Sequence, residues 1–154
     1  RCTHLVWWKC QNNKHKDYLR RIDASYACNF NCPECDYSKG EQEIRYWLNT
    51  NQIIFKAQKS FDNLVGLKNG LLTYDFYLPT YNFLIEYQGE QHDHPVDFKH
   101  LGKKKTLEEF EHQKEHDRRK RQYAKDHNID LLEIWYWDYD NIEKILNNKL
   151  RRKK

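Results

Sequence analysis

LTYDFYLPTYNFLIEYQ, residues 72–88, contains two apolar and aromatic runs separated by the turn-forming residues PTYN. The runs Leu72–Leu78 and Phe83–Gln88 have the composition of buried β-strands, and the proline and asparagine between them favour a turn. We therefore expect a hairpin. Each predicted strand carries an acid among its apolar residues, Asp75 in the first and Glu86 in the second.

These two acids need a partner if the strands are buried. Burying a carboxylate costs several kcal/mol unless its charge is compensated, and a divalent cation compensates it well. Side chains alternate along a strand, so Glu86 and Gln88 share one face, and Asp75 converges on them if its strand is the neighbour. Mg²⁺ takes one or two carboxylates, a carbonyl such as that of Tyr87, and waters, which leaves room for a phosphate oxygen. A bound Mg²⁺ or Mn²⁺ activates water, so the pattern predicts phosphodiester hydrolysis.

Capping boxes and hydrophobic periodicity predict the elements around this hairpin. These are a helix from Ser38-x-x-Glu41 to Asn49, a strand at Ile53–Ala57, a helix from Thr106-x-x-Glu109 to about Asp126, a strand at Leu131–Trp137 and a helix capped by Asp138. The order α-β-β-β-α-β-α predicts an α/β domain over residues 38–150, followed by a basic tail at 151–154. The polar residues 89–105 are too many for a simple connection, which suggests a functional loop.

Residues 1–37 have a different character, because four of the five cysteines lie between residues 10 and 35. Too few apolar residues accompany them to form a core, so we expect a module held together by an ion. Cys10, His15, Cys32 and Cys35 have a spacing that suits a closed structural Zn²⁺ site. Cys28 is the alternative to His15 as fourth ligand.

Charge and hydropathy suggest where the protein acts and on what. The chain has 27 Lys and Arg against 23 Asp and Glu, a net charge of +4, and its basic residues are clustered. Such clusters can contact several phosphates of double-stranded DNA. The candidates are Lys103, Lys104, Lys105, Lys114, Arg118 and Arg121. In the alternative interpretation Lys114 and Arg121 form ordinary helix ion pairs with Asp117.

No apolar run approaches the ~20 residues that a membrane span needs, and no signal peptide opens the chain. We therefore expect a soluble protein inside a host cell, in a reducing compartment where cysteines bind metal. The chain contains no methionine, so we expect it to be part of a longer product. No heptad repeat or extended apolar face marks a dimer surface, which predicts a monomer or weak dimer.

Asp75, with ten residues before Glu86-x-Gln88, resembles the motif of the PD-(D/E)XK nucleases, in the variant with Gln at the Lys position. More narrowly, residues 38–148 resemble the phage and intron-encoded homing endonucleases related to the very-short-patch mismatch repair enzyme. The sequence segments that carry this resemblance are YDFYLP (residues 74–79) and IEYQG-x-QH (residues 85–92). It implies a restriction-endonuclease-like core and site-specific, Mg²⁺-dependent cleavage of double-stranded DNA.

The resemblance also implies roles for single residues. Glu43 corresponds to a helix glutamate that orients a metal-bound water or binds a second ion, and its alternative is an ordinary exposed helix residue. Gln88 replaces the lysine that positions or activates the attacking water in the family. Since Gln cannot take a proton, the base is a second water, a substrate phosphate or His92. We expect His94 and His100 to be ordinary polar loop residues.

Two other functions compete with this hypothesis. The first is a catalytically inactive DNA-binding regulator on a nuclease scaffold, and the intact set Asp75, Glu86 and Gln88 argues against it. The second is a zinc-stapled adaptor that binds protein, which predicts no salt-dependent affinity for DNA. The aromatic residues Trp135, Tyr136 and Trp137 are expected in the core or at the sheet edge, rather than as groups that stack on bases.

Overall fold

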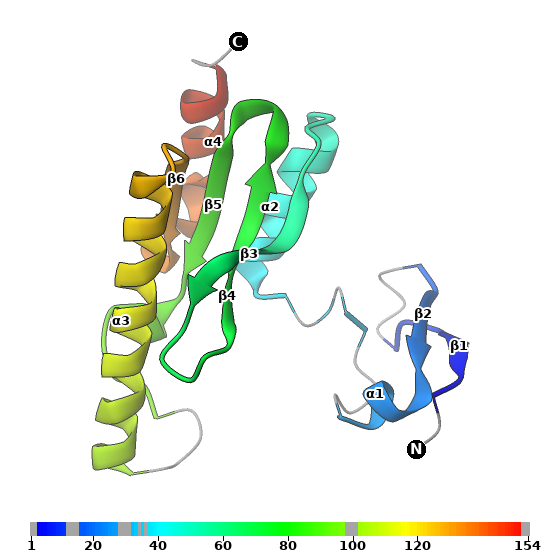
Figure 1. The fold of residues 1–154 in the computed structure, drawn as a ribbon. Helices are drawn as coiled ribbons and strands as arrows, with labels where there is room; N and C mark the ends of the chain where they lie inside the picture. The colour runs from blue at the N-terminus through cyan, green and yellow to red at the C-terminus, as the bar shows by residue number, and fades with distance from the viewer. Residues whose placement is uncertain are drawn as a thin grey trace. The chain divides into compact units, whose positions relative to one another are not determined.

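The structure, a computed structural model, describes residues 3–11, 16–27, 32–33, 35, 37–97 and 102–151. Contacts divide the chain into two compact units, Arg1–Gln42 and Glu43–Lys154. Figure 1 shows the elements of both units. No helix of the described residues is long and apolar enough to cross a membrane.

The second unit contains a mixed sheet of four strands in the order β3-β4-β5-β6. Its strands are β3 (Lys56–Val65), β4 (Leu71–Leu78), β5 (Phe83–Gln88) and β6 (Asp130–Trp135). The pairs β3–β4 and β4–β5 are antiparallel, and β5–β6 is parallel. The predicted hairpin is thus confirmed, and the fold is mixed α/β as expected.

Three helices accompany the sheet, α2 (Lys39–Thr50), α3 (Lys103–Asp126) and α4 (Ile142–Arg151). Short 3₁₀ helices follow three of the strands: η1 (Pro79–Tyr81) after β4, η2 (Glu90–His92) after β5 and η3 (Tyr136–Asn141) after β6. The order of helices and strands from residue 38 onward is therefore the predicted α-β-β-β-α-β-α. Because β5 and β6 are parallel, the chain must cross over between them, and α3 lies in that crossover.

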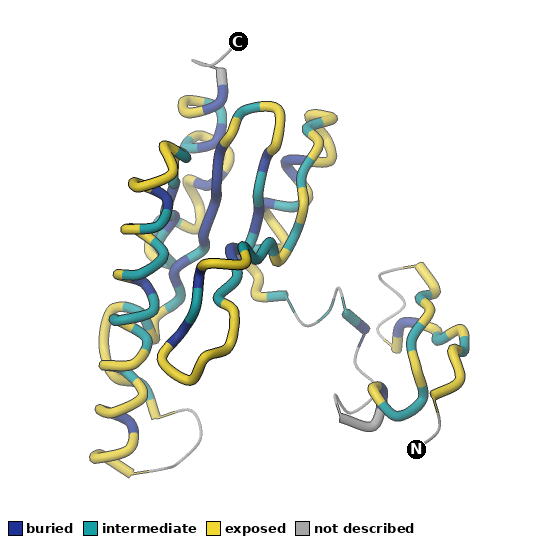
Figure 2. Tube along the Cα trace, in the orientation of Figure 1, coloured by how far each residue is buried: buried dark blue, intermediate teal, exposed yellow. Residues whose placement is uncertain are grey.

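The two faces of the sheet are covered by different helices. Residues of α2 and α4, such as Leu48 and Leu146, pack with Phe76 and Ile85 in the larger apolar cluster. Ala124 of α3 belongs to a smaller cluster on the other face. Figure 1 shows α3 on one side of the sheet and α2 and α4 on the other, and Figure 2 shows β5 as an almost continuously buried strand. The sheet is therefore covered on both faces, and a polar residue in β5 is withdrawn from water.

Four predicted elements have ends that differ from the structure. The strand expected at Ile53–Ala57 begins only at Lys56 and runs to Val65. The helix α3 begins at Lys103, so Thr106 lies inside it, where its hydroxyl donates to the carbonyl of Gly102. The last strand ends at Trp135, and the expected cap Asp138 lies in η3, before α4 begins. The other capping box is confirmed, because Ser38 and Glu41 exchange hydrogen bonds of 2.8 and 3.2 Å.

The first unit contains a hairpin of β1 (Leu5–Trp8) and β2 (Tyr18–Arg21), followed by α1 (Ile22–Ala27). Trp7 is 71% exposed, which shows how little apolar surface this unit buries.

Candidate active site

At Asp75 the side chains of β4 stop alternating regularly between the two faces of the sheet. Its neighbours Tyr74 and Phe76 belong to the two different apolar clusters, although alternation would place them on one face. The β4–β5 register runs only from Leu78 to Phe76, and beyond it the backbone N–H of Tyr87 donates to Asp75 Oδ2 at 2.7 Å. The carboxylate thus replaces a ladder partner and is held between the two strands.

The neighbouring strand β3 is also irregular at this point. Ala57 pairs with Phe76 and Lys59 with Tyr74, so Gln58 lies opposite Asp75. Gln58 has a φ of 49°, in the left-handed region that residues other than glycine rarely adopt. Backbone strain of this kind is concentrated at functional sites.

Glu86 of β5 is the most strongly perturbed acid near Asp75. It is 3% exposed, and its carboxylate accepts a hydrogen bond of 2.7 Å from the ammonium of Lys120 on α3. Its pKa is raised to about 8, chiefly by burial and then by the charge of Asp75, while Lys120 lowers it and Asp117 raises it. Burial and the two neighbouring acids therefore disfavour the charged form of Glu86 by more than Lys120 favours it.

Gln88, two residues further on the same face of β5, is 2% exposed. Its Nε2 donates to Glu133 Oε1 of β6 at 2.8 Å, and Glu133 also accepts from Arg121 of α3 at 2.8 to 3.0 Å. Its Oε1 is buried and has no hydrogen-bond partner in the part of the chain that the structure describes. The amide is thus held at one end only.

His92 of η2 is held by a buried acid. Its Nδ1 lies 2.8 Å from Asp117 Oδ2, and Gln113 donates to Asp117 Oδ1 at 3.0 Å. The side chains of His92 and Asp117 are 12% and 4% exposed. Because a carboxylate only accepts, Nδ1 carries the proton, and Nε2 is the nitrogen left to accept a proton from a ligand.

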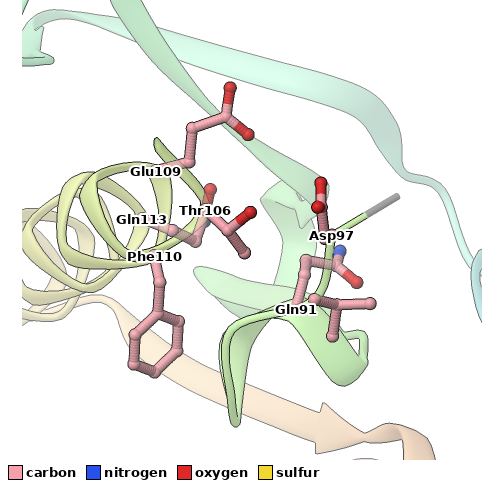
Figure 3. A pocket seen from close by; sticks show the side chains of 7 residues that line it. Gln91, Asp97, Thr106, Glu109, Phe110 and Gln113 are labelled. Carbon is pink, nitrogen blue, oxygen red and sulfur yellow. The ribbon is translucent and has the colours of Figure 1, made fainter. Parts of the chain in front are cut away.

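A cavity of about 320 Å³ lies between this histidine segment and the N-terminal half of α3. Figure 3 shows Gln113 and Glu109 of α3 on one side and Gln91 and Asp97 on the other. Since Gln113 both lines this cavity and holds Asp117, the cavity borders the His92 network. The cavity therefore lies beside the residues that hold His92.

The cysteine group lies in the first unit. Cys10, Cys32 and Cys35 have sulfur atoms that all lie within 4.8 Å of one another, and could hold a metal ion such as zinc. Cys10 Sγ and Cys35 Sγ are 3.6 Å apart, close to the roughly 3.8 Å that tetrahedral Zn–S bonds of about 2.3 Å require. The candidate fourth ligands His15 and Cys28 lie outside the described residues. Within those residues, no other group of three His, Cys, Asp or Glu side chains is this close.

Glu43 has no contact with the other predicted catalytic residues among the interactions that the structure describes. It is an exposed residue of α2, the helix that packs on the face opposite α3. No hydrogen bond or ion pair that the structure shows among its described residues connects it to Asp75, Glu86 or Gln88.

The loop histidines expected to be ordinary polar residues lie outside the buried network. His94 is half exposed and pairs with Glu90 and Asp93 at 3.0 and 3.2 Å. His100 lies outside the described residues.

The six basic residues predicted to contact DNA divide into two groups. Lys103, Lys104 and Lys105 are exposed at the start of α3. Three are paired with acids: Lys114 with Glu111 at 3.8 Å, Arg118 with Glu115 at 2.7 Å and Arg121 with Glu133 at 2.8 Å. The alternative pairing of Lys114 and Arg121 with Asp117 is wrong, because Asp117 is buried against His92.

Lys120 and Glu133 are the residues of this site that sequence reasoning missed. A signal for Glu133 was present, since it is an acid in an otherwise apolar strand, as Asp75 and Glu86 are. It is the register partner of Glu86 in the parallel β5–β6 pair. Lys120 had no such signal, because it is one of many charged residues along α3.

Comparison with known proteins adds no relative. No family model, curated protein or solved structure matches this chain. The assignment to the PD-(D/E)XK superfamily is therefore still a prediction from the motif residues.

Proposed function

We propose that this protein is a metal-dependent DNA endonuclease with a restriction-endonuclease-like core, of the site-specific homing type that its motif resembles. The observation that carries the proposal is the buried charge around Glu86. Asp75 and Asp117 both act electrostatically on Glu86, and Lys120 is the cation in contact with Glu86. The nearby Arg121 and Glu133 balance each other, so with all acids ionised the three carboxylates and one ammonium leave an excess of negative charge, which a divalent cation would offset.

The donor set fits a hard cation. Asp75 and Glu86 offer carboxylate oxygens, the class of ligand that Mg²⁺ and Mn²⁺ prefer, and the buried Oε1 of Gln88 lacks a partner among the described residues. When bound there, the ion supplies Lewis-acid stabilisation and an activated water. Binding requires Glu86 to exchange its contact with Lys120 for the metal.

His92 is the proposed proton acceptor in this reaction. Asp117 holds Nδ1 and thereby fixes the tautomer in which Nε2 can accept a proton. Gln88 is the proposed positioning group, and Glu43 is assigned an assisting role by the resemblance alone.

Binding of double-stranded DNA is assigned to α3 and to the cysteine module. Lys103, Lys104 and Lys105 are exposed and suited to phosphates, whereas Lys114, Arg118 and Arg121 must exchange an acid for a phosphate. Zinc in the cysteine group would hold the first unit in shape for further contacts.

The test is cleavage of supercoiled plasmid by the purified protein with Mg²⁺ or Mn²⁺. We expect nicking or linearisation that EDTA abolishes and that Asp75→Asn lowers by about 100-fold or more, because the loss of a metal ligand is worth several kcal/mol. Asp62→Asn, which changes an exposed acid of β3, is the matched control and should cut as the wild type does. The amide oxygen introduced by Asp75→Asn can still accept the hydrogen bond from the backbone N–H of Tyr87, so the fold should survive.

A second candidate is the catalytically inactive DNA-binding regulator. Two observations favour it. Glu86 already forms an ion pair with Lys120, and no three acidic or histidine side chains among the described residues lie close enough together to hold a metal ion. The same assay separates the two functions: a regulator binds DNA with strong salt dependence, cuts nothing with either metal, and is indifferent to Asp75→Asn.

A further inference from the structure

The Gln88 amide is buried with only one of its two polar ends satisfied. Nε2 donates to Glu133, while Oε1 has no hydrogen-bond partner within the described ranges of the chain. Buried carbonyl oxygens are nearly always paired, because losing water without a replacement is costly. Because Gln88 is only 2% exposed, its unpaired oxygen leaves a buried acceptor that a ligand can use.

Glu133 decides which end of the amide is left over. A carboxylate can only accept, so it attracts the NH₂ group of Gln88 and repels the carbonyl oxygen. Arg121 bonds both oxygens of Glu133, through Nε at 3.0 and 2.9 Å, and fixes the carboxylate in place. The unpaired end must therefore be the oxygen, and it faces away from Glu133.

The Gln88 side chain lies on the same face of β5 as Glu86, which we assign to the metal. Glu86 contacts α3 directly, through Lys120. Gln88 is connected to α3 through Glu133, which pairs with Arg121. Amide oxygens are ordinary ligands for hard divalent cations, alongside carboxylates.

We propose that Gln88 binds the divalent cation through Oε1, and that Glu133, anchored by Arg121, is the positioning residue that presents this oxygen. The inference rests on the proposed function and gives Gln88 a different task from the lysine that it replaces: it is a ligand and does not activate water. The chain Arg121, Glu133, Gln88 runs from the surface to the site, since Arg121 is 45% exposed and Glu133 22%.

The test measures Mn²⁺ affinity by electron paramagnetic resonance, without DNA, on the whole 154-residue chain with its cysteines loaded with Zn²⁺. Gln88→Met keeps the volume and removes the oxygen, and Glu133→Gln removes the group that orients it. Each should weaken Mn²⁺ binding by about 10- to 100-fold, the range for lost ligand support. Gln122→Met, at an exposed glutamine of α3 bonded to Asp126, is the matched control and should bind as the wild type does.

A swap of the two side chains gives the sharper result. In Gln88→Glu with Glu133→Gln, the amide at 133 donates to the carboxylate at 88, whose second oxygen still faces the cation. This double variant should recover Mn²⁺ affinity to within a few-fold of wild type, which a merely structural role of Glu133 does not predict.

Each outcome bears on one proposal or on both. Wild-type affinity in Gln88→Met, with binding lost in Asp75→Asn, overturns the ligand role of Gln88 and leaves the nuclease site standing. Failure of the swap to recover binding overturns the positioning role of Glu133. Equal binding by the wild type and Asp75→Asn removes the metal site itself, and with it both this inference and the proposed function.

Discussion

The cysteine group and the acids Asp75 and Glu86 lie in different units and are held in place by opposite means. Cys10, Cys32 and Cys35 already lie within 4.8 Å of one another, in a unit that leaves Trp7 largely exposed. The carboxylates lie in a sheet covered on both faces, and Glu86 is paired with Lys120. A metal in the cysteine group would therefore hold the fold of the first unit, whereas the packing of the second unit holds Asp75 and Glu86 in place without a metal.

The largest effect should come from removing zinc. A strong chelator, or Cys35→Ser, should unfold the first unit and leave the second folded, because structural zinc contributes on the order of 10 kcal/mol to small modules. Hydrogen exchange followed by mass spectrometry reports each unit separately. Loss of protection in both units at once would show that the second depends on the metal as well. His15→Ala and Cys28→Ala, tested in the same way, decide which residue is the fourth ligand.

The second unit should depend on its apolar face instead. Phe76→Ala removes a fully buried ring from the larger cluster and should lower the free energy of unfolding by about 3 to 5 kcal/mol. EDTA, which removes the divalent cation, should leave the unfolding midpoint of this unit in urea almost unchanged. A large shift with EDTA would contradict the view that the fold holds this site.

The third effect is a pH dependence of stability in metal-free solution. The pKa of Glu86 is raised to about 8 in the folded state from 4.5, so the folded protein binds the proton more tightly. The stability that this gives is fully present below pH 4.5 and falls as the pH rises to about 8, by up to about 1.4 kcal/mol per pH unit. Glu86→Gln should flatten this slope in urea titrations at several pH values. An unchanged slope in the variant means that another group is responsible.

The smallest effect concerns the basic residues of α3. Lys104→Gln removes an exposed charge and should reduce the slope of DNA affinity against salt concentration by about 1. Arg118→Gln should change the slope less, because Arg118 is paired with Glu115 at 2.7 Å. Fluorescence anisotropy at several salt concentrations measures both, and equal changes would show that the ion pair opens freely on DNA.

Strands with apolar runs were predictable, and an edge strand was not. Phe83–Gln88 coincides with β5 because this central strand is buried at every residue except the partly buried Tyr87. At the edge of the sheet, β3 needs few apolar side chains. Most of its residues, KAQKSFDN, are polar and do not form a strand-like apolar pattern, so the strand was predicted at Ile53–Ala57 instead. The start of α3 was misplaced for a local reason, since the capping box at Thr106 is a pattern that a helix interior also tolerates.

The sequence by itself identifies the polar residues and cysteines that need a charge partner or a metal. Asp75, Glu86 and Gln88 stand out as polar groups in apolar strands, and the cysteines stand out by their spacing. Which charges meet was visible only in the folded chain: Lys120 with Glu86, Asp117 with His92, and Arg121 with Glu133. In a strand, alternation alone tells which side chains share a face. The 24-residue helix α3 carries charged residues on all sides, so its sequence does not show which of them face the sheet. Only the packing of α3 across β5 and β6 selects the side chains that reach the site.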